Sequence, residues 1–244
     1  MSATYNDIRL KIPFIGESGV GKTSLIYKLV KPEHTVRPED SVGHATIGIA
    51  FSTLHIFDDN QDSISIHIWD TAGQERFNAC IPLFFRESDI IVVMFDLTQK
   101  DSFESAIHKW MPMVERYCGQ INDNGVISSD EPQQDNDTTP RGNTVVVLIG
   151  NKADQWSDDN DNHVTQDEID EYCFDKQLVF FPISANIDTR RALLDHCILT
   201  PLGKYKQFNT DYIKMRNKNI VQLDEEPTNG SGCFTKNKSH CLIL

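Results

Sequence analysis

Apolar and polar stretches alternate along the first two thirds of the chain. Apolar runs at residues 8–15, 90–97 and 144–150 predict strands, and the last two are unbroken, as expected of central strands in a parallel sheet covered on both faces. Residues 47–57 and 63–69 predict two further strands joined by a short polar turn, and the second alternates apolar and polar positions. This pair predicts an antiparallel hairpin at one edge of the sheet.

Stretches with helical periodicity separate these strands. They predict helices over residues 24–30, 102–117, 166–177 and 188–199, and Pro112 is an interruption that can kink the second of them. Residues 178–186 predict one more strand. Strands that alternate with helices predict an α/β fold with a mostly parallel central sheet, one antiparallel edge hairpin and helices on both faces.

Two stretches do not fit this compact unit. Residues 119–143 are polar, their charged residues are acidic except Arg141, and Gly, Pro, Asn and Ser occur throughout, so they predict a long, mobile inserted loop. From residue 203 onward, 7 Lys and Arg face 4 Asp and Glu, a net charge of +3, whereas residues 1–202 carry 16 against 32, a net charge of −16. We therefore expect one folded domain over residues 1–202 and a flexible tail over residues 203–244.

Composition and charge narrow the classes of function. The whole chain has 244 residues and a net charge of −13, which disfavours attraction to nucleic acid phosphates. Its six cysteines form no C-x-x-C pair and have no histidine at zinc spacing, so neither a disulfide framework nor a metal cage is indicated. The first residues lack an apolar signal core, Ser2 stands where myristoylation needs glycine, and no apolar run reaches the length of a membrane span. We expect a protein of the cytosolic side of the cell.

A glycine-rich loop follows the first predicted strand. GESGVGKT at residues 16–23 fits the pattern G-x-x-x-x-G-K-[ST] between a strand and a helix, which predicts a P-loop NTPase fold. Lys22 would reach the β- and γ-phosphates of a nucleotide, and the Thr23 hydroxyl would bind Mg²⁺. The expected phosphate-binding residues are Gly16, Ser18, Gly19, Val20, Gly21, Lys22, Thr23 and Ser24.

A second motif, WDTAGQE, starts at the end of the alternating strand. Asp70 is placed to hold Mg²⁺ through a water molecule. Gly73 can offer its backbone N–H to a γ-phosphate because no Cβ blocks the approach, and Gln74 can orient a water for in-line attack. Gln74 is therefore the candidate catalytic residue.

Two further motifs select the base. In NKAD at residues 151–154, Asp154 can accept hydrogen bonds from both N1–H and the exocyclic amine of guanine, which adenine does not offer. Asn151 would brace the loops, and the stem of Lys152 would lie along the base. In the following motif, Ser184, Ala185 and Asn186, the backbone N–H of Ala185 could donate to the guanine carbonyl.

In this order and on these strand ends, the motifs resemble those of small GTPases of the Ras superfamily, and among them the Rab family, over about residues 8–200. The resemblance implies a GTP-binding and GTP-hydrolysing switch in vesicle and membrane traffic, with GTP or GDP and Mg²⁺ as ligands and slow hydrolysis without an activating protein. Thr46 would reach Mg²⁺ when the γ-phosphate is present. Phe51, Trp69 and Phe84 would form the aromatic triad that meets effectors, and ordinary core packing is the alternative for each.

The resemblance also implies partners and a place in the cell. The partners are a nucleotide exchange factor, a GTPase-activating protein, GTP-dependent effectors, a prenyltransferase and a prenyl-binding chaperone, and the protein itself would be a monomer. Cys241 begins a C-a-a-X box that favours geranylgeranylation, and Cys233 is either a second acylation site or a plain thiol. These features place the protein on the cytoplasmic face of intracellular membranes, cycling with cytosol.

Two other functions compete with this interpretation. The first is a scaffold that signals by nucleotide occupancy and hydrolyses little GTP. It is favoured only by the lack of a Phe, Tyr or Trp between Tyr27 and Phe51 to brace the guanine, since only His34 and His44 are available there. An ATP-using kinase or motor is disfavoured by Asp154.

Overall fold

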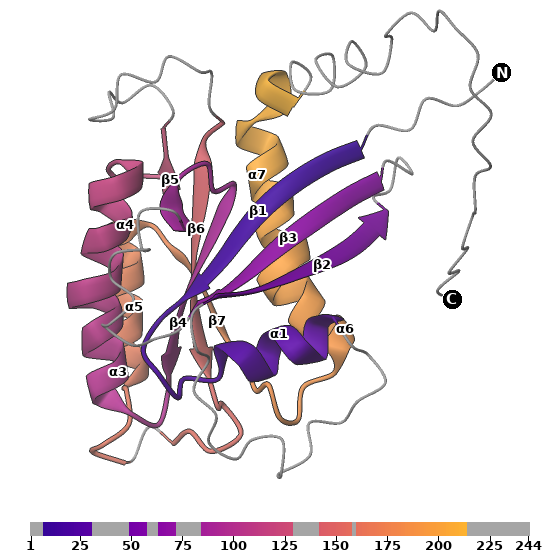
Figure 1. Ribbon diagram of the computed structural model, residues 1–244. Helices are drawn as coiled ribbons and strands as arrows, with labels where there is room; N and C mark the ends of the chain where they lie inside the picture. Colours follow the sequence, from indigo (N-terminus) through magenta and orange to yellow (C-terminus); the bar gives the residue numbers. More distant parts are fainter. Residues whose placement is uncertain are drawn as a thin grey trace, which may run out of the picture.

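A computed structural model of the chain describes residues 7–30, 49–57, 63–71, 84–128, 142–157 and 160–213. They form a seven-stranded sheet in the order β2-β3-β1-β4-β6-β5, in which β7 also pairs with β6 (Figure 1). The strands are β1 (Asp7–Ile15), β2 (Ile49–Phe57), β3 (Ser63–Thr71), β4 (Ile90–Asp96), β5 (Val126–Ile127), β6 (Thr144–Asn151) and β7 (Val179–Pro182).

The sheet is mostly parallel, as the sequence predicts. The pairs β1–β3, β1–β4, β4–β6 and β6–β7 are all parallel. Strands β2 and β3 form the predicted antiparallel hairpin at one edge, with Phe51 opposite Trp69. Because the parallel strands run in one direction, the loops that follow β1, β3, β4, β6 and β7 gather at the same end of the sheet.

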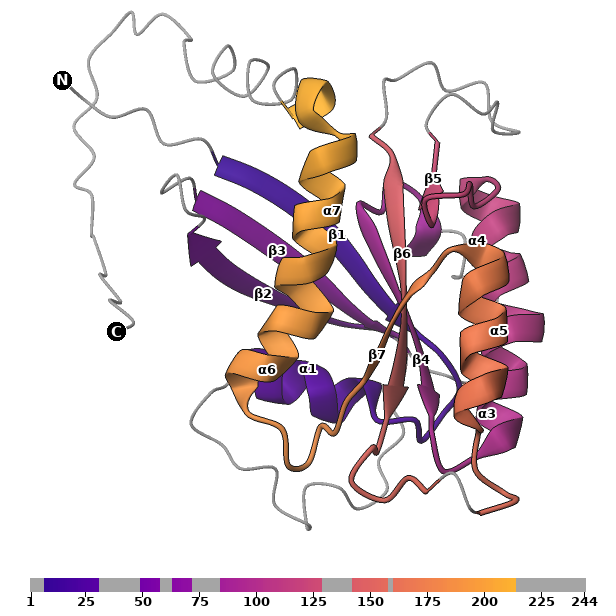
Figure 2. The same cartoon turned by 180° about the vertical axis from the view of Figure 1, so that it is seen from behind.

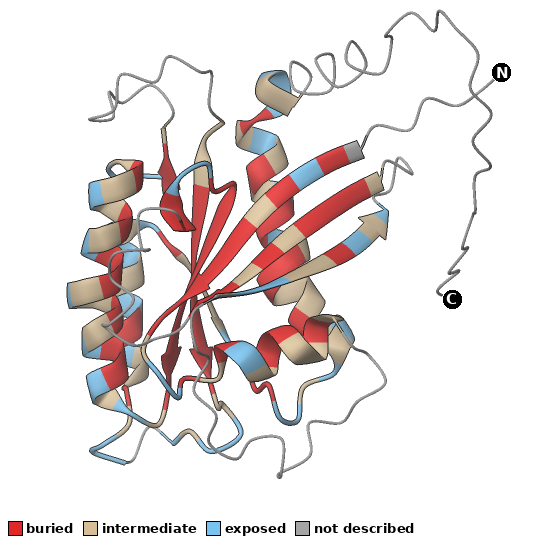
Figure 3. Ribbon diagram, in the orientation of Figure 1, coloured by how far each residue is buried: buried red, intermediate tan, exposed pale blue. Residues whose placement is uncertain are grey.

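Helices cover both faces of the sheet. Helices α1 (Lys22–Val30), α6 (Arg190–Leu194) and α7 (Thr200–Phe208) lie on one face, and α3 (Lys100–Ser105), α4 (Met111–Cys118) and α5 (Gln166–Lys176) lie on the other (Figures 1 and 2). Alternate residues of β4 enter two separate core clusters, one under each layer of helices. Every residue of β4 is consequently buried, which accounts for its unbroken apolar sequence (Figure 3).

The start of α5 shows how a local signal sets a helix boundary. The Thr165 hydroxyl accepts from the backbone N–H of Glu168, and the Glu168 carboxylate accepts from the backbone N–H of Thr165, at 3.3 and 3.0 Å. This capping box satisfies two N–H groups that have no partner inside the helix. The helix ends at Lys176, before Gln177 in the left-handed conformation, close to the predicted range of 166–177.

Proline is accommodated inside the helix that was expected to kink at Pro112. Helices α3 and α4 are joined without a break by a π-helical turn, η2 (Ala106–Trp110), in which the Met111 N–H donates to the Ala106 carbonyl. Proline has no N–H, and its ring would clash with the carbonyl four residues earlier in a regular α-helix. The wider turn just before Pro112 removes this conflict, so the helix continues.

The last helix also has a π-helical turn before a proline, and it extends further than predicted. A second π-helical turn, η3 (Asp195–Leu199), joins α6 to α7, and Pro201 follows it at the start of α7. The sequence predicts that this helix ends at residue 199, but the π-helical turn lets it pass the proline. Helical structure reaches residue 213 after a break at Asn209.

The folded body therefore ends later than the expected boundary at residue 202. Tyr205 is fully buried, and its hydroxyl donates to Asp89 Oδ1 at 2.6 Å. The Asn209 amide accepts from the backbone N–H of Asn143 and donates to its carbonyl, at 2.5 and 3.0 Å. These contacts hold α7 and the residues after it against the sheet. Residues 214–244 of the expected tail lie outside the described residues.

The expected insertion is also shorter than predicted. Its first ten residues include the strand β5, which pairs antiparallel with the start of β6. Val126 and Ile127 are both buried, because Val126 packs into one core cluster and Ile127 into the other. Residues 129–141 of the expected loop lie outside the described residues.

Candidate functional site

The phosphate-binding loop predicted from GESGVGKT lies directly against the ends of two other strands. Gly16 has a φ of +144°, and a Cβ atom placed on it would lie 2.1 Å from the Met94 carbonyl oxygen. Gly21 has a φ of +96°, and its Cβ atom would lie 2.2 Å from Asn151 Nδ2. Only glycine fits at these two positions, so the glycine pattern reflects a close approach of backbone to β4 and to Asn151, the last residue of β6.

Lys22 begins α1 at the end of this loop and is buried. Its Nζ donates to the carbonyl oxygens of Gly16 and Glu17, at 2.8 and 2.7 Å. Burial lowers the pKa of Lys22 to about 8, although the negative charges of Asp70 and Glu17 act in the opposite direction. Among the described residues, the hydrogen-bond partners of this cation are backbone carbonyls, and such a cation at a helix N-terminus offers a strong site for a phosphate group.

Thr23 and Asp70 meet beside the loop. The Thr23 hydroxyl donates to Asp70 Oδ2 at 2.7 Å, and Asp70 is buried at the end of β3. Within the described ranges no group of three or more His, Cys, Asp and Glu residues could hold a metal by itself. A hydroxyl and one carboxylate fit Mg²⁺, which takes oxygen ligands and usually keeps waters and substrate phosphates for the remaining positions.

Asn151 ties three loops together. Its buried side-chain amide donates to the Val20 carbonyl at 2.8 Å and accepts from the backbone N–H of Ala185 at 2.9 Å. The structure thus brings Asn151 to the bracing position expected from the sequence. The Ala185 N–H, which the sequence assigns to the guanine carbonyl, donates to Asn151 here.

Asp154 is exposed beside the loop that contains Ser184. Its Oδ1 accepts from the Ser184 hydroxyl at 2.6 Å, and that hydroxyl oxygen accepts from the backbone N–H groups of Asn186 and Ile187. Partial burial tends to raise the pKa of Asp154, but its hydrogen bonds outweigh this effect and hold the pKa below its usual value. Asp154 is therefore a charged acceptor at neutral pH, as recognition of a base with two donors requires.

Comparison with known proteins identifies the family. The sequence model of the Ras family matches residues 11–193, well over half of the chain. The chain belongs to the Ras family.

Its relatives within this family include Rab and Ypt proteins. The GTP-binding protein ypt5 of Schizosaccharomyces pombe is 31% identical over 178 residues, which are 73% of this chain and 70% of the relative. Rab-18 of Caenorhabditis elegans is 42% identical over 115 residues, 47% of this chain and 52% of the relative. Rab-17 of Mus musculus is 29% identical over 218 residues, 89% of this chain and 86% of the relative.

The Ras-family protein is thus a Rab-like small GTPase of the membrane-trafficking type. It binds guanine nucleotide, hydrolyses GTP and depends on regulators and effectors in general, as its family does. The competing interpretation as an occupancy scaffold is not favoured. No helix of the described residues combines the length and the apolar character needed to cross a bilayer.

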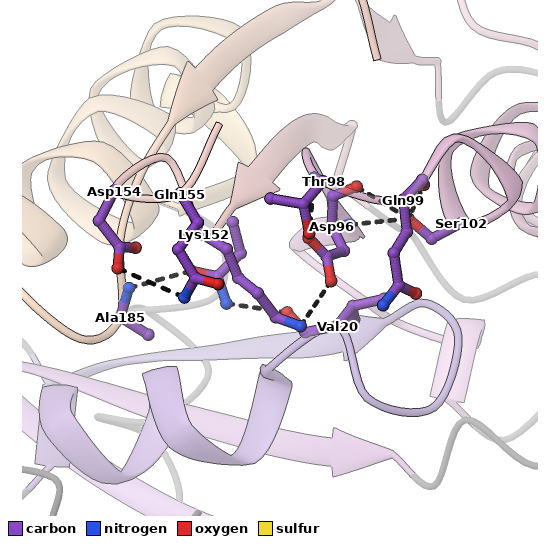
Figure 4. Close-up of polar contacts among 10 residues, drawn as sticks. Val20, Asp96, Thr98, Gln99, Ser102, Lys152, Asp154, Gln155 and Ala185 are labelled. Atoms are coloured by element: carbon purple, nitrogen blue, oxygen red, sulfur yellow. Dashed lines mark hydrogen bonds and ion pairs between the residues drawn. The ribbon is translucent and has the colours of Figure 1, made fainter. Parts of the chain in front are cut away.

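Asp96 supports this GTPase site, although no sequence motif contains it. Lys152, in the left-handed conformation with a φ of +66°, directs its Nζ to Asp96 Oδ2 at 2.5 Å (Figure 4). The other oxygen of the buried Asp96 carboxylate accepts from the Thr98 N–H and hydroxyl, at 2.9 and 2.7 Å. Asp96 thus fixes the side chain expected to lie along the base. In the sequence, Asp96 is noticeable as an acidic residue inside the apolar run 90–97.

The three aromatic residues expected to meet effectors of the GTPase differ in exposure. Phe51 is 53% exposed, and its ring meets that of Trp69 edge-on at 5.5 Å. Phe84 is buried in the core cluster on the α3–α5 side of the sheet, against which Trp69 also packs. Core packing, the alternative considered from sequence, describes Phe84, whereas Phe51 presents its ring to solvent.

Five expected site residues lie outside the described residues. They are Thr46, Gly73 and Gln74 of the two predicted switches, and the lipidation candidates Cys233 and Cys241.

Proposed function

We propose that the two switches of this GTPase respond to GTP and Mg²⁺ held at the carboxyl end of the sheet. The observation that supports this most is Asn151, which joins the phosphate loop to the loops of Asp154 and Ala185. A single buried side chain thereby sets the relation between the groups expected to bind phosphate and those expected to select guanine.

In this mechanism the Lys22 ammonium, which has three N–H donors, donates to oxygens of the β- and γ-phosphates. Thr23, Thr46 and, through a water molecule, Asp70 would hold Mg²⁺, and the ion would neutralise charge on the phosphates. Gly73 donates to the γ-phosphate and Gln74 orients the attacking water. An activating protein supplies the further positive charge that makes hydrolysis fast.

Analysis of the nucleotide bound to the purified protein tests this function directly. Denaturation should release GDP or GTP, with Mg²⁺ in the native protein at about one ion per nucleotide. An adenine nucleotide in their place would contradict the assignment of Asp154.

Binding should take up a proton near pH 8. The pKa of free Lys22 is about 8, and phosphates favour the charged ammonium, so the pKa rises on binding. At a pH between these two pKa values, the complex holds more protons than the free protein. The affinity for nucleotide therefore falls as the pH rises above 8, by about tenfold between pH 7 and pH 9. Calorimetry in buffers of different ionisation enthalpy should show uptake of about half a proton at pH 8. Release of protons on binding would contradict this role of Lys22.

Asp154→Asn should weaken guanine selectivity. The amide keeps an acceptor for the Ser184 hydroxyl but presents a donor to the guanine amine, and the lost charge-assisted hydrogen bonds cost about 1.5–3 kcal/mol. Competition experiments with labelled GTP should show a fall in affinity of about tenfold or more, and XTP should become an effective competitor. Asp161→Asn, an exposed carboxylate in the same loop, is the matched control.

We further propose that a lipid on Cys241 attaches the protein to the cytoplasmic face of intracellular membranes, between periods in the cytosol. A prenyltransferase and a prenyl-binding chaperone would serve this cycle, and an exchange factor and an activating protein would set the nucleotide state. One prenyl chain gives only reversible attachment, so Lys236, Lys238 and an acyl chain on Cys233 are candidates for a second signal.

Substitutions in the tail should therefore cause a graded loss of membrane binding. Cys241→Ser should move the protein wholly into the soluble fraction. Replacing Lys236 and Lys238 together by glutamine should only shorten membrane residence, because each lysine adds about 1 kcal/mol at an anionic surface. Cell fractionation at two salt concentrations measures both effects. A Cys241→Ser protein that still sediments with membranes would show that another group is the anchor.

A further inference from the structure

Glu17, the second residue of the phosphate loop, is held by the π-helical turn η2. Glu17 Oε1 accepts from Lys109 Nζ at 2.6 Å and from the indole Nε1 of Trp110 at 3.2 Å. The side chains of Glu17 and Lys109 are only 26% and 29% exposed, and Trp110 is buried. A carboxylate with two donors in a partly buried place has a well-defined position.

The same residue touches the phosphate-binding lysine through its backbone. The Glu17 carbonyl accepts from Lys22 Nζ at 2.7 Å. Glu17 therefore contacts the helix with its side chain and Lys22 with its main chain. Movement of the carboxylate would also disturb a carbonyl that holds Lys22 in place.

Two consecutive residues of the π-helical turn reach this carboxylate. Lys109 and Trp110 are the last residues of η2, the turn that precedes Pro112. The Lys109 ammonium also lies 4.9 Å from the centre of the Trp110 ring, which is within the range of a cation–π contact. The indole and the ammonium thus support each other as well as Glu17.

The charge of Glu17 makes this contact important for an anionic ligand. A free carboxylate next to bound phosphates would repel them, and the repulsion would grow with the charge of the nucleotide. Lys109 compensates this charge locally, and both residues lie close enough to Lys22 to act on its pKa, Glu17 raising it and Lys109 lowering it.

We propose that Lys109 and Trp110 are positioning residues of the nucleotide site. By holding the Glu17 carboxylate against η2, they keep it away from the phosphates and fix the backbone that Lys22 contacts. This role presupposes the phosphate site proposed above, and neither Lys109 nor Trp110 belongs to any of the nucleotide-binding motifs.

The dissociation rates of fluorescent GDP and of a non-hydrolysable fluorescent GTP analogue test this role. Lys109→Met, which keeps the stem but removes the charge, should speed dissociation of the triphosphate by about tenfold and that of the diphosphate by less. Lys109→Arg should stay within about twofold of the unmodified protein because it restores the charge. Lys176→Met is the matched control, since Lys176 forms an ion pair of 2.7 Å with Glu115 between α5 and α4.

A second substitution separates electrostatic positioning from loss of packing. Adding Glu17→Gln to Lys109→Met removes the uncompensated charge, so dissociation should return to within about threefold of the unmodified protein. Equal acceleration for both nucleotides, failure of Glu17→Gln to rescue, or the same effect in Lys176→Met would each overturn the proposal. If the unmodified protein binds guanine nucleotide and Lys109→Met releases it at the normal rate, the role of Lys109 fails alone. If the unmodified protein binds none, the proposed nucleotide site fails as well.

Discussion

Gln74→Leu is expected to leave GTP binding intact and to lower activator-stimulated hydrolysis by about a hundredfold or more. Leucine has nearly the size of glutamine but cannot orient the attacking water, whereas the groups that bind the base and phosphates are unchanged. Single-turnover hydrolysis with a competent activating protein measures this effect, and the variant should accumulate in its GTP form.

The control for this prediction is Gln166→Leu. Gln166 lies in the first turn of α5, where its side chain bonds Asp170 at the surface. This substitution should leave the rate unchanged. An unaltered rate in Gln74→Leu would mean that another residue positions the water.

Asn151→Ala is expected to weaken guanine nucleotide binding by more than a hundredfold. The substitution leaves the Val20 carbonyl and the Ala185 N–H without their partner in a buried place, and each such group costs about 1–3 kcal/mol. The nucleotide is expected to contact all three loops that Asn151 joins, so the affinity should carry most of this cost. Equilibrium titration with labelled GDP gives the affinity, and thermal unfolding of the nucleotide-free protein gives the part that belongs to the fold.

A second asparagine serves as the reference for this effect. Asn122 Oδ1 accepts from the backbone N–H groups of Asn124 and Val126 in a turn far from the nucleotide loops. Asn122→Ala should lower stability with little change in affinity. If Asn151→Ala bound GDP normally, the bridging amide would have no part in the site.

Local sequence patterns predicted the architecture because they report on burial. The two unbroken apolar runs belong to β4 and β6, which are covered on both faces, and the alternating run belongs to the edge hairpin. The phosphate loop was predictable for a similar reason. Gly16 and Gly21 stand where backbone approaches backbone or a buried amide, and few other loops impose that requirement at this spacing.

The end of the folded body could not be predicted, because it depends on contacts between distant residues. Composition changes near residue 203, yet the buried hydroxyl of Tyr205 bonds Asp89, 116 residues earlier. A proline such as Pro201 ordinarily ends a helix, but the π-helical turn before it lets this helix continue. The change in composition, a valid local signal, therefore placed the boundary too early.

The residues of the site that belong to a motif could be predicted from the sequence. The residues that hold them in place through contacts could not. Lys22, Thr23, Asp70, Asn151 and Asp154 are found together as expected. Asp96 and Lys109 belong to no motif, and each acts through a residue of a motif, Lys152 in one case and Glu17 in the other. The role of such supporting residues can be assigned only when the strands and helices are placed, even where the sequence shows an unusual residue, as at Asp96.

The pairing of Asn209 with Asn143 has a practical consequence for studying partners. Asn143 precedes β6, so the end of α7 lies where the parallel strands begin, and Asp7 starts β1 at this same pole (Figure 1). The loops that follow the strands lie at the opposite pole. A biosensor that captures the protein by a tag before Asp7 or after Ile213 will consequently leave the nucleotide loops facing the flowing analyte.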